Sequence, residues 1–128
     1  MTERVAKGNF EVKLTPTSAP DAAVGAMSIA KTFHGDLDGT SVGAMLAVRT
    51  PVEGSAGYVA MERVTGTLAG HKGSFALQHS GTLTQGAPTL SVSVVPDSGT
   101  DQLAGLKGTM DIIISPGRHD YVFRYTLP

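Results

Sequence analysis

Apolar and polar residues alternate along much of the chain with a period of two residues. Such alternation is typical of a strand whose successive side chains point to opposite faces of a sheet. The first clear example is a segment in which Phe10, Val12 and Leu14 alternate with Glu11 and Lys13. This segment is predicted to be a strand with one buried and one solvated face.

Seven further segments show related patterns, and the stretches between them are rich in the Gly, Pro, Asp and Ser residues that favour turns. In most of these segments, residues that share one face are mainly apolar. In chain order these sets are Met27, Ile29, Lys31 and Phe33; Val42, Ala44, Leu46 and Val48; Tyr58, Ala60, Glu62, Val64 and Leu68; Phe75, Leu77 and His79; Leu90, Val92 and Val94; the segment 106–114; and His119, Tyr121, Phe123, Tyr125 and Leu127.

Eight strands with short links favour a closed sheet, because closure into a barrel removes the unpaired edges of an open sheet. A barrel of eight strands is just wide enough for packed side chains or one small ligand. We therefore predict an all-β fold, with a single eight-stranded antiparallel barrel over residues 1–128 and a flexible segment at 1–7. The run Ile112, Ile113, Ile114 predicts local burial on both faces, by another subunit or by a loop.

Composition limits the classes of partner. The chain has 10 Lys and Arg against 11 Asp and Glu, a net charge of −1, and no basic stripe that would neutralise nucleic-acid phosphates. No apolar run approaches the roughly 20 residues that a membrane helix needs. The absence of cysteine excludes disulfides and thiolate metal sites, and it suits a reducing compartment. We expect a cytoplasmic protein that binds neither nucleic acid nor membranes.

Several polar residues share a face with apolar neighbours and are candidates to line a cavity. Glu62 is the candidate catalytic residue, because burial and a nearby Lys31 or Arg63 would shift its pKa in opposite directions and a carboxylate can act as a general base. The alternative is a buried ion pair with Lys31 or Arg63 that only fixes the strand register. Periodicity does not decide whether Glu62 or Arg63 faces the interior.

The expected ligand-binding residues combine polar and aromatic side chains. They are Lys31, Tyr58, His79, Tyr121, Phe123 and Tyr125. For His79 the alternative is a hydrogen-bonded core residue, and for the aromatic residues it is ordinary core packing. His34, Asp36 and Asp38 adjoin a turn and lack a third ligand at a recognised spacing, so we expect no metal and no cofactor.

Four strings resemble a bacterial family, the domain-of-unknown-function family 3224, whose barrel is similar to that of allene oxide cyclases. They are GDLDGTSVGAML, YVAMERVTGTLAG, GSFALQHSGT and VVPDSGTDQLAGLKGTM, and the resemblance covers nearly the whole chain. It implies an eight-stranded barrel with a central apolar pocket and a tendency to form homo-oligomers, with a dimer as the expected size. Allene oxide cyclases use a glutamate to guide the cyclisation of a fatty-acid epoxide, but no motif aligns that glutamate with Glu62.

Three hypotheses for function follow. The first is an isomerase or cyclase that binds a small apolar substrate inside the barrel, with Glu62 as base or electrostatic anchor and Lys31 or His79 orienting it. The second is a non-catalytic, lipocalin-like carrier or sensor of a small hydrophobic ligand in the same pocket. The third is a structural barrel that is filled by its own side chains. The volume of the cavity separates the third hypothesis from the other two.

Overall fold

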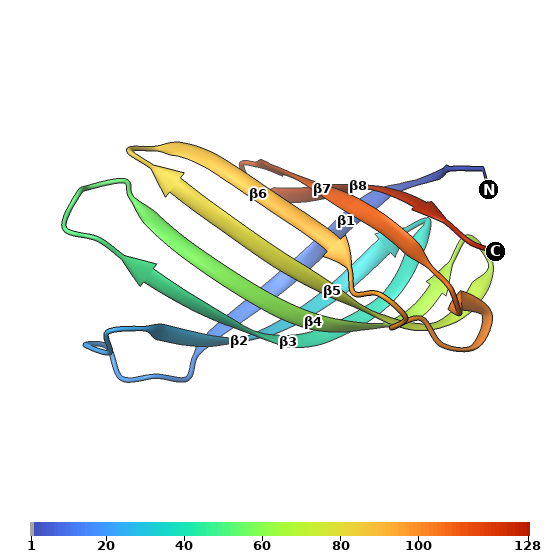
Figure 1. Cartoon of the computed structure of the whole chain (residues 1–128), viewed down its shortest axis with the longest axis horizontal. Coiled ribbons are helices and arrows are strands. Elements are labelled where there is room, and N and C mark those ends of the chain that lie inside the picture. The colour runs from blue at the N-terminus through green and yellow to red at the C-terminus, as the bar shows by residue number, and fades with distance from the viewer. Residues whose placement is uncertain (1) are drawn as a thin grey trace.

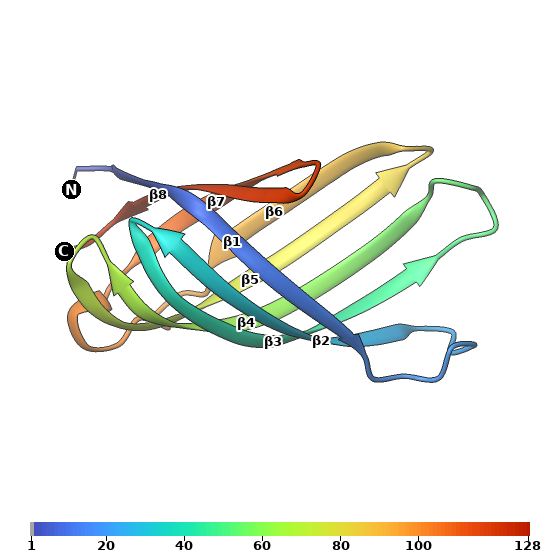
Figure 2. The same ribbon diagram turned by 180° about the vertical axis from the view of Figure 1, so that it is seen from behind.

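The computed structural model describes residues 2–128, and its eight strands form one closed antiparallel barrel in chain order (Figures 1 and 2). This confirms the predicted fold. The elements are β1 (Arg4–Pro16), β2 (Gly25–Gly35), β3 (Leu37–Arg49), β4 (Ala56–Leu68), β5 (His71–Thr84), β6 (Ala87–Val94), a short 3₁₀ helix η1 (Asp101–Leu103), β7 (Lys107–Ser115) and β8 (Arg118–Thr126). The further likeness to allene oxide cyclases stays a prediction.

One half of the barrel interior is packed with apolar and aromatic side chains. The rings of Phe75 and Phe123 stack with their centroids 5.8 Å apart, and those of Phe123 and Tyr125 stack at 5.3 Å. The connection between β6 and β7 carries η1 and contributes Leu103 and Leu106, which are at most 1% exposed. These contacts make one end of the barrel a conventional hydrophobic core.

The seam between β6 and β7 is the weakest junction of the barrel wall. These two strands share one described backbone pair, Ser93 with Thr109, whereas β4 and β5 are paired along their full length. Apart from that pair, the described residues of β6 and β7 form no backbone pairs with one another. The wall is therefore loosest toward the end opposite η1.

Two expectations about order and burial need correction. Residues 1–7 were expected to be flexible, but β1 begins at Arg4, and Arg4–Lys7 pair with Val122–Tyr125 of β8 to close the barrel. Residue 1 lies outside the described residues. No loop of the chain covers the isoleucine run on both faces, because Ile113 is 50% and Ile114 is 72% exposed near the loose end of β7. Burial by another subunit stays a prediction.

The apolar residues of β3 occupy the outer wall of the barrel rather than its interior. The inward positions of β3 include Leu37, Ser41 and two glycines, while Val42 is 68% exposed. Gly43 is required inside because a Cβ there would lie 2.8 Å from both Cα and Cβ of Glu62. Close approach of β4 thus reserves the inward position of Gly43 for a residue without a side chain.

Replacing this glycine tests the close approach. We expect Gly43→Ala to lower the free energy of unfolding by about 1–3 kcal/mol, because the added methyl group overlaps the β4 backbone. Gly57→Ala is the matched control: the nearest neighbouring atom to its Cβ is 4.0 Å away, and we expect a change within about 0.5 kcal/mol or a slight stabilisation. Urea unfolding monitored by circular dichroism measures the free energy of unfolding of both variants. Equal losses in the two variants would contradict the close packing of Gly43 against Glu62.

Candidate functional site

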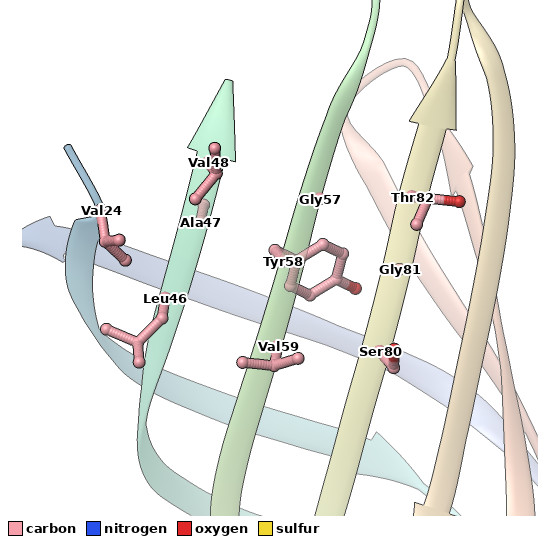
Figure 3. A pocket seen from close by; sticks show the side chains of 10 residues that line it. All are labelled: Val24, Leu46, Ala47, Val48, Gly57, Tyr58, Val59, Ser80, Gly81 and Thr82. Carbon is pink, nitrogen blue, oxygen red and sulfur yellow. The ribbon is translucent and has the colours of Figure 1, made fainter. Parts of the chain in front are cut away.

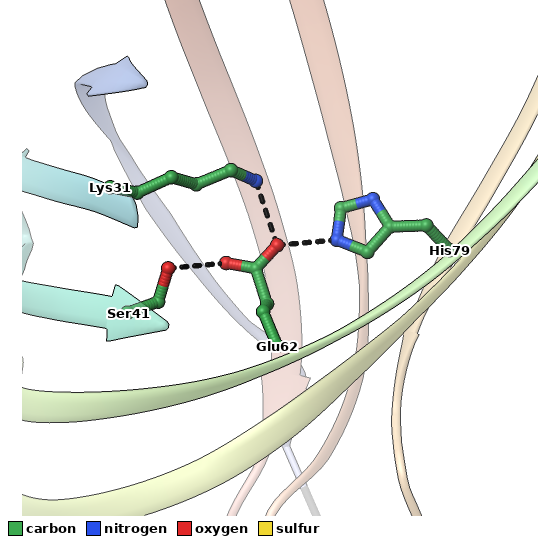
Figure 4. A network of polar contacts seen from close by, with 4 residues as sticks. All are labelled: Lys31, Ser41, Glu62 and His79. Atoms are coloured by element: carbon green, nitrogen blue, oxygen red, sulfur yellow. Dashed lines mark hydrogen bonds and ion pairs between the residues drawn. The ribbon is translucent and has the colours of Figure 1, made fainter. Parts of the chain in front are cut away.

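A buried polar cluster spans four consecutive strands of the barrel. Lys31 of β2, Ser41 of β3, Glu62 of β4 and His79 of β5 all point inward, and their exposures are 8%, 3%, 2% and 5%. Figure 4 shows the other three side chains converging on the carboxylate of Glu62. The structure thus places Glu62 inside the barrel, whereas Arg63 is exposed on the outer wall.

Both carboxylate oxygens of Glu62 are hydrogen-bonded. The ammonium of Lys31 donates to Oε2 over 2.7 Å, and the imidazole Nε2 of His79 lies 2.6 Å from the same oxygen. The hydroxyl of Ser41 donates to Oε1 over 2.8 Å. The expected ion pair between Lys31 and Glu62 is therefore present, and its geometry satisfies the buried charge.

The surroundings of Glu62 keep its carboxylate ionised. Burial alone would raise its pKa, but the hydrogen bond with His79 and the charge of Lys31 outweigh burial and lower the pKa to about 2. A carboxylate with this pKa is a weak proton acceptor near neutral pH. Glu62 is thus better suited to orient and balance its neighbours than to act as the general base expected from the sequence.

His79 keeps one ring nitrogen free for other contacts. Because an ionised carboxylate can only accept hydrogen bonds, the hydrogen in the contact with Glu62 belongs to Nε2 of His79. In the neutral ring Nδ1 then carries a lone pair. Within residues 2–128, Nδ1 has no hydrogen-bond partner, yet it is not among the polar atoms sealed in the protein interior.

Lys31 is held between its carboxylate partner and two aromatic rings. Its Nζ lies 4.8 Å from the ring centroid of Phe10 and 5.8 Å from that of Phe33. A cation over the face of a ring is attracted by the ring quadrupole. One of the three ammonium hydrogens bonds Glu62, and no other described residue accepts a hydrogen bond from this group.

A cavity of about 150 Å³ lies against this cluster, in the half of the barrel away from η1. Its lining includes Lys31, Tyr58, His79 and His119 together with apolar residues from β1, β2, β3, β6 and β7. Met45, Tyr58, Leu90 and Ile114 also line an apolar space of about 310 Å³ at the barrel mouth. The barrel is therefore filled in one half and hollow in the other.

The predicted ligand-binding residues divide between these two halves. Lys31, Tyr58 and His79 line the cavity. Burial and, secondarily, the charge of Glu62 raise the pKa of Tyr58, so its hydroxyl stays protonated. The expectation for Tyr121, Phe123 and Tyr125 needs correction, because they belong to the packed core and do not contribute to the cavity wall.

Tyr121 has a structural partner set of its own. Its hydroxyl accepts a hydrogen bond from the Leu37 backbone N–H over 2.9 Å and donates to the carbonyl oxygen of His34 at 2.9 Å. It thereby ties β8 to the turn between β2 and β3.

Sequence reasoning missed Ser41 as a site residue, because the more conspicuous apolar alternation of β3 lies on its opposite face. Ser41 lies on the same face of the strand as the apolar Leu37 and Met45, and this pattern could have identified it as an inward residue.

A second apolar hollow lies outside the barrel, on the wall formed by β3, β4 and β5 (Figure 3). It has a volume of about 460 Å³, and its lining includes Leu46, Val59 and Thr82 together with Gly57, which has no side chain (Figure 3). Within residues 2–128, no three His, Cys, Asp or Glu side chains group as metal ligands. No helix in the same range is long and apolar enough to cross a membrane.

The low pKa of Glu62 gives a measurable dependence of stability on acid. The pKa of Glu62 is about 2 in the folded protein, whereas the ordinary pKa of a glutamate, expected in the unfolded chain, is 4.5. The ionised carboxylate therefore contributes fully to the free energy of unfolding above pH 4.5, and this contribution is lost as the pH falls toward 2. We expect the wild-type protein to lose about 3 kcal/mol more unfolding free energy over this range than the double variant Lys31→Met/Glu62→Leu. Urea titrations at several pH values measure both, and parallel curves would contradict an ionised, stabilising Glu62.

Comparisons with known proteins agree on one family. The model of the family described as "Protein of unknown function (DUF3224)" matches residues 6–125. A solved structure from Shewanella oneidensis MR-1, described as a protein with unknown function from the DUF3224 family, is 46% identical and has a TM-score of 0.93. That alignment covers 99% of this chain and 98% of the other. No curated protein matches. The chain belongs to the DUF3224 family, as its sequence strings predicted.

Proposed function

We propose that this protein binds a small, mainly apolar molecule in the hollow half of its barrel, with one oxygen atom of that molecule directed at Lys31. The observation that carries the proposal is an apolar cavity with a charged, hydrogen-bonded cluster in its wall. Ligand pockets combine these features, because apolar walls supply affinity and a few polar groups fix orientation. A barrel selected only for stability could replace the ion pair with apolar side chains.

The charges of the cluster favour a neutral oxygen acceptor, such as a carbonyl group. Lys31 and Glu62 cancel one another when His79 is neutral. A second carboxylate in this apolar space would lack a matching cation, whereas a carbonyl oxygen can accept a hydrogen bond from Lys31 without adding charge. The proposed ligand class is therefore a small apolar ketone or related carbonyl compound.

The pocket serves either a carrier or an enzyme, as the sequence hypotheses anticipated. Binding without chemistry corresponds to a lipocalin-like carrier or sensor. An isomerase or cyclase is the second candidate, and the free Nδ1 of His79 is the observation that favours it. The lack of cysteine supports a cytoplasmic location for either activity.

Filling the cavity tests the binding proposal. Ala60 is 4% exposed and lines the cavity beside His79, so Ala60→Leu places added methyl groups in the proposed ligand space. We expect wild-type protein to bind 2-octanone and Ala60→Leu to bind it at least about tenfold more weakly, a change of about 1.4 kcal/mol. Titrations followed by backbone amide shifts measure both affinities.

Ala87→Leu is the matched control, because Ala87 is exposed at the start of β6 and lines neither the cavity nor the apolar space at the barrel mouth. It should leave 2-octanone binding unchanged. Retained binding in Ala60→Leu, or shifts confined to residues outside the cavity, would show that the interior is not the binding site. Thermal unfolding of each variant establishes that the barrel is intact.

The partner in solution is proposed to be a second copy of the chain, docked through the outer apolar face of β2, β3 and β4. This face comprises the outward residues Val24, Ala26, Ala30, Val42, Ala44, Leu46, Val48, Val59 and Met61. Its one charged neighbour on β4 is Arg63, which lies opposite Val42 at the edge of the face. The ion pairs Arg124–Asp111 and Arg118–Asp120 lie on the part of the wall formed by β7 and β8.

An apolar sheet face can pack against its own copy, which suits a two-fold dimer. The exposed fractions of its larger side chains correspond to an area on the order of 550 Å² per copy. Two copies would then bury roughly 1,100 Å², which is near the lower limit for a specific interface. The hollow at Gly57 provides space for side chains of the partner.

Two valines with similar exposure test this interface. Val59 is 52% exposed within the face, and Val5 is 49% exposed on β1 outside it. We expect wild type and Val5→Lys to sediment at twice the 13.2 kDa mass of one chain, and Val59→Lys to sediment as a single chain. A monomeric wild type, or an unchanged mass for Val59→Lys, would contradict the proposed dimer.

A further inference from the structure

The arrangement of Glu62, His79 and Lys31 has the parts of a proton-transfer site. A base needs a lone pair that faces the substrate, and a third group must hold the base in one orientation. Here the Glu62 carboxylate fixes Nε2 of His79 over 2.6 Å and leaves Nδ1 with the lone pair. His79 also forms part of the cavity wall.

Lys31 supplies the second requirement, a positive charge for an oxygen that becomes negative during the reaction. Its ammonium and Nε2 of His79 bond the same carboxylate oxygen from two sides (Figure 4), and both residues line the cavity. Both groups are buried, and a charge in a buried site interacts more strongly than it does in water. His79 as base and Lys31 as cation are therefore positioned to contact a carbonyl oxygen and the carbon next to that carbonyl group.

We propose that the protein catalyses proton transfer at a carbon next to the carbonyl group of a small apolar ketone, with His79 as the base. Nδ1 takes the proton as the C–H bond breaks, and the electron pair of that bond forms a carbon–carbon double bond. The carbonyl π electrons move to the oxygen, which is held by Lys31. Return of the proton to the same carbon gives exchange, and return to the γ-carbon of an unsaturated ketone gives an isomer.

This inference rests on the proposed binding function and assigns new roles within the same cavity. His79 and Lys31 contact the substrate as catalytic residues, and Glu62 is a positioning residue that acts through His79. The titratable groups that face His79 are Lys31 of β2, Glu62 and Tyr58 of β4, and His119 of β8. The proton acceptor is the neutral ring of His79.

The experiment follows uptake of deuterium from D₂O at the carbons next to the carbonyl of 2-octanone by NMR. Wild-type protein should accelerate uptake over buffer, and His79→Gln should lower this rate at least about 100-fold. The glutamine side chain keeps an N–H group that can donate to Glu62. His34→Gln is the matched control, because His34 also pairs with a carboxylate, that of Glu11, but it is exposed on the outer wall and does not line the cavity. It should leave the rate within about twofold of wild type.

Two further variants separate catalytic from structural roles. Lys31→Met should lower the turnover rate by about tenfold or more, because the developing oxygen charge loses its partner. Glu62→Gln should lower the turnover rate and alter its pH profile while leaving KM for 2-octanone nearly unchanged. Amide-shift titrations with 2-octanone accompany each assay, so binding and chemistry are measured on the same samples.

The outcomes distinguish this inference from the proposed function on which it rests. Binding of 2-octanone in the cavity without accelerated exchange would overturn the proton-transfer activity and leave a carrier. Absence of binding would overturn both. Exchange that persists in folded His79→Gln would show that another group is the base and would overturn the assignment of His79.

Discussion

A negative charge placed inside an apolar barrel constrains the whole interior of this protein. Glu62 is 2% exposed, and a carboxylate in such surroundings is costly unless it is paired and hydrogen-bonded. Lys31, Ser41 and His79 satisfy it from three neighbouring strands. Because a slip of one residue would turn any of these side chains to the outer wall, the cluster also fixes the register of β2 to β5.

The cluster divides the barrel into two halves with different roles. On one side the stacked rings of Phe75, Phe123 and Tyr125 and the buried Leu103 form a packed core that stabilises the fold. On the other side the interior is hollow and the β6–β7 seam is nearly unpaired. A rigid half that supports an open half is a suitable arrangement for a binding site, because the site residues are held in place without filling the space a ligand needs.

The outer wall shows a comparable division. The ion pairs Arg124–Asp111 and Arg118–Asp120 lie on β7 and β8, and Glu11–His34 joins β1 to β2. The outward positions of β3 and β4 next to the hollow at Gly57 carry mainly apolar side chains. Large exposed apolar surfaces on a folded domain usually mark an interaction site. The interior cavity and this face lie on opposite sides of the same β3–β4 wall, and Tyr58 borders both the cavity and the hollow at Gly57.

By itself, the sequence determined the fold class, the number of strands and which residues share a face, because successive side chains of a strand alternate between its two faces. It did not decide whether Glu62 or Arg63 faces the interior; burial of Glu62 in the structure does. It did not determine which face of β3 is internal, since that depends on the close approach of Glu62 to Gly43. Nor did it separate His119, which lines the cavity, from Tyr121, which shares its face but packs in the core. The alternation indicates whether a side chain points into or out of the barrel. Its position along the barrel axis depends on the tilt and stagger of all eight strands, which only the tertiary structure decides.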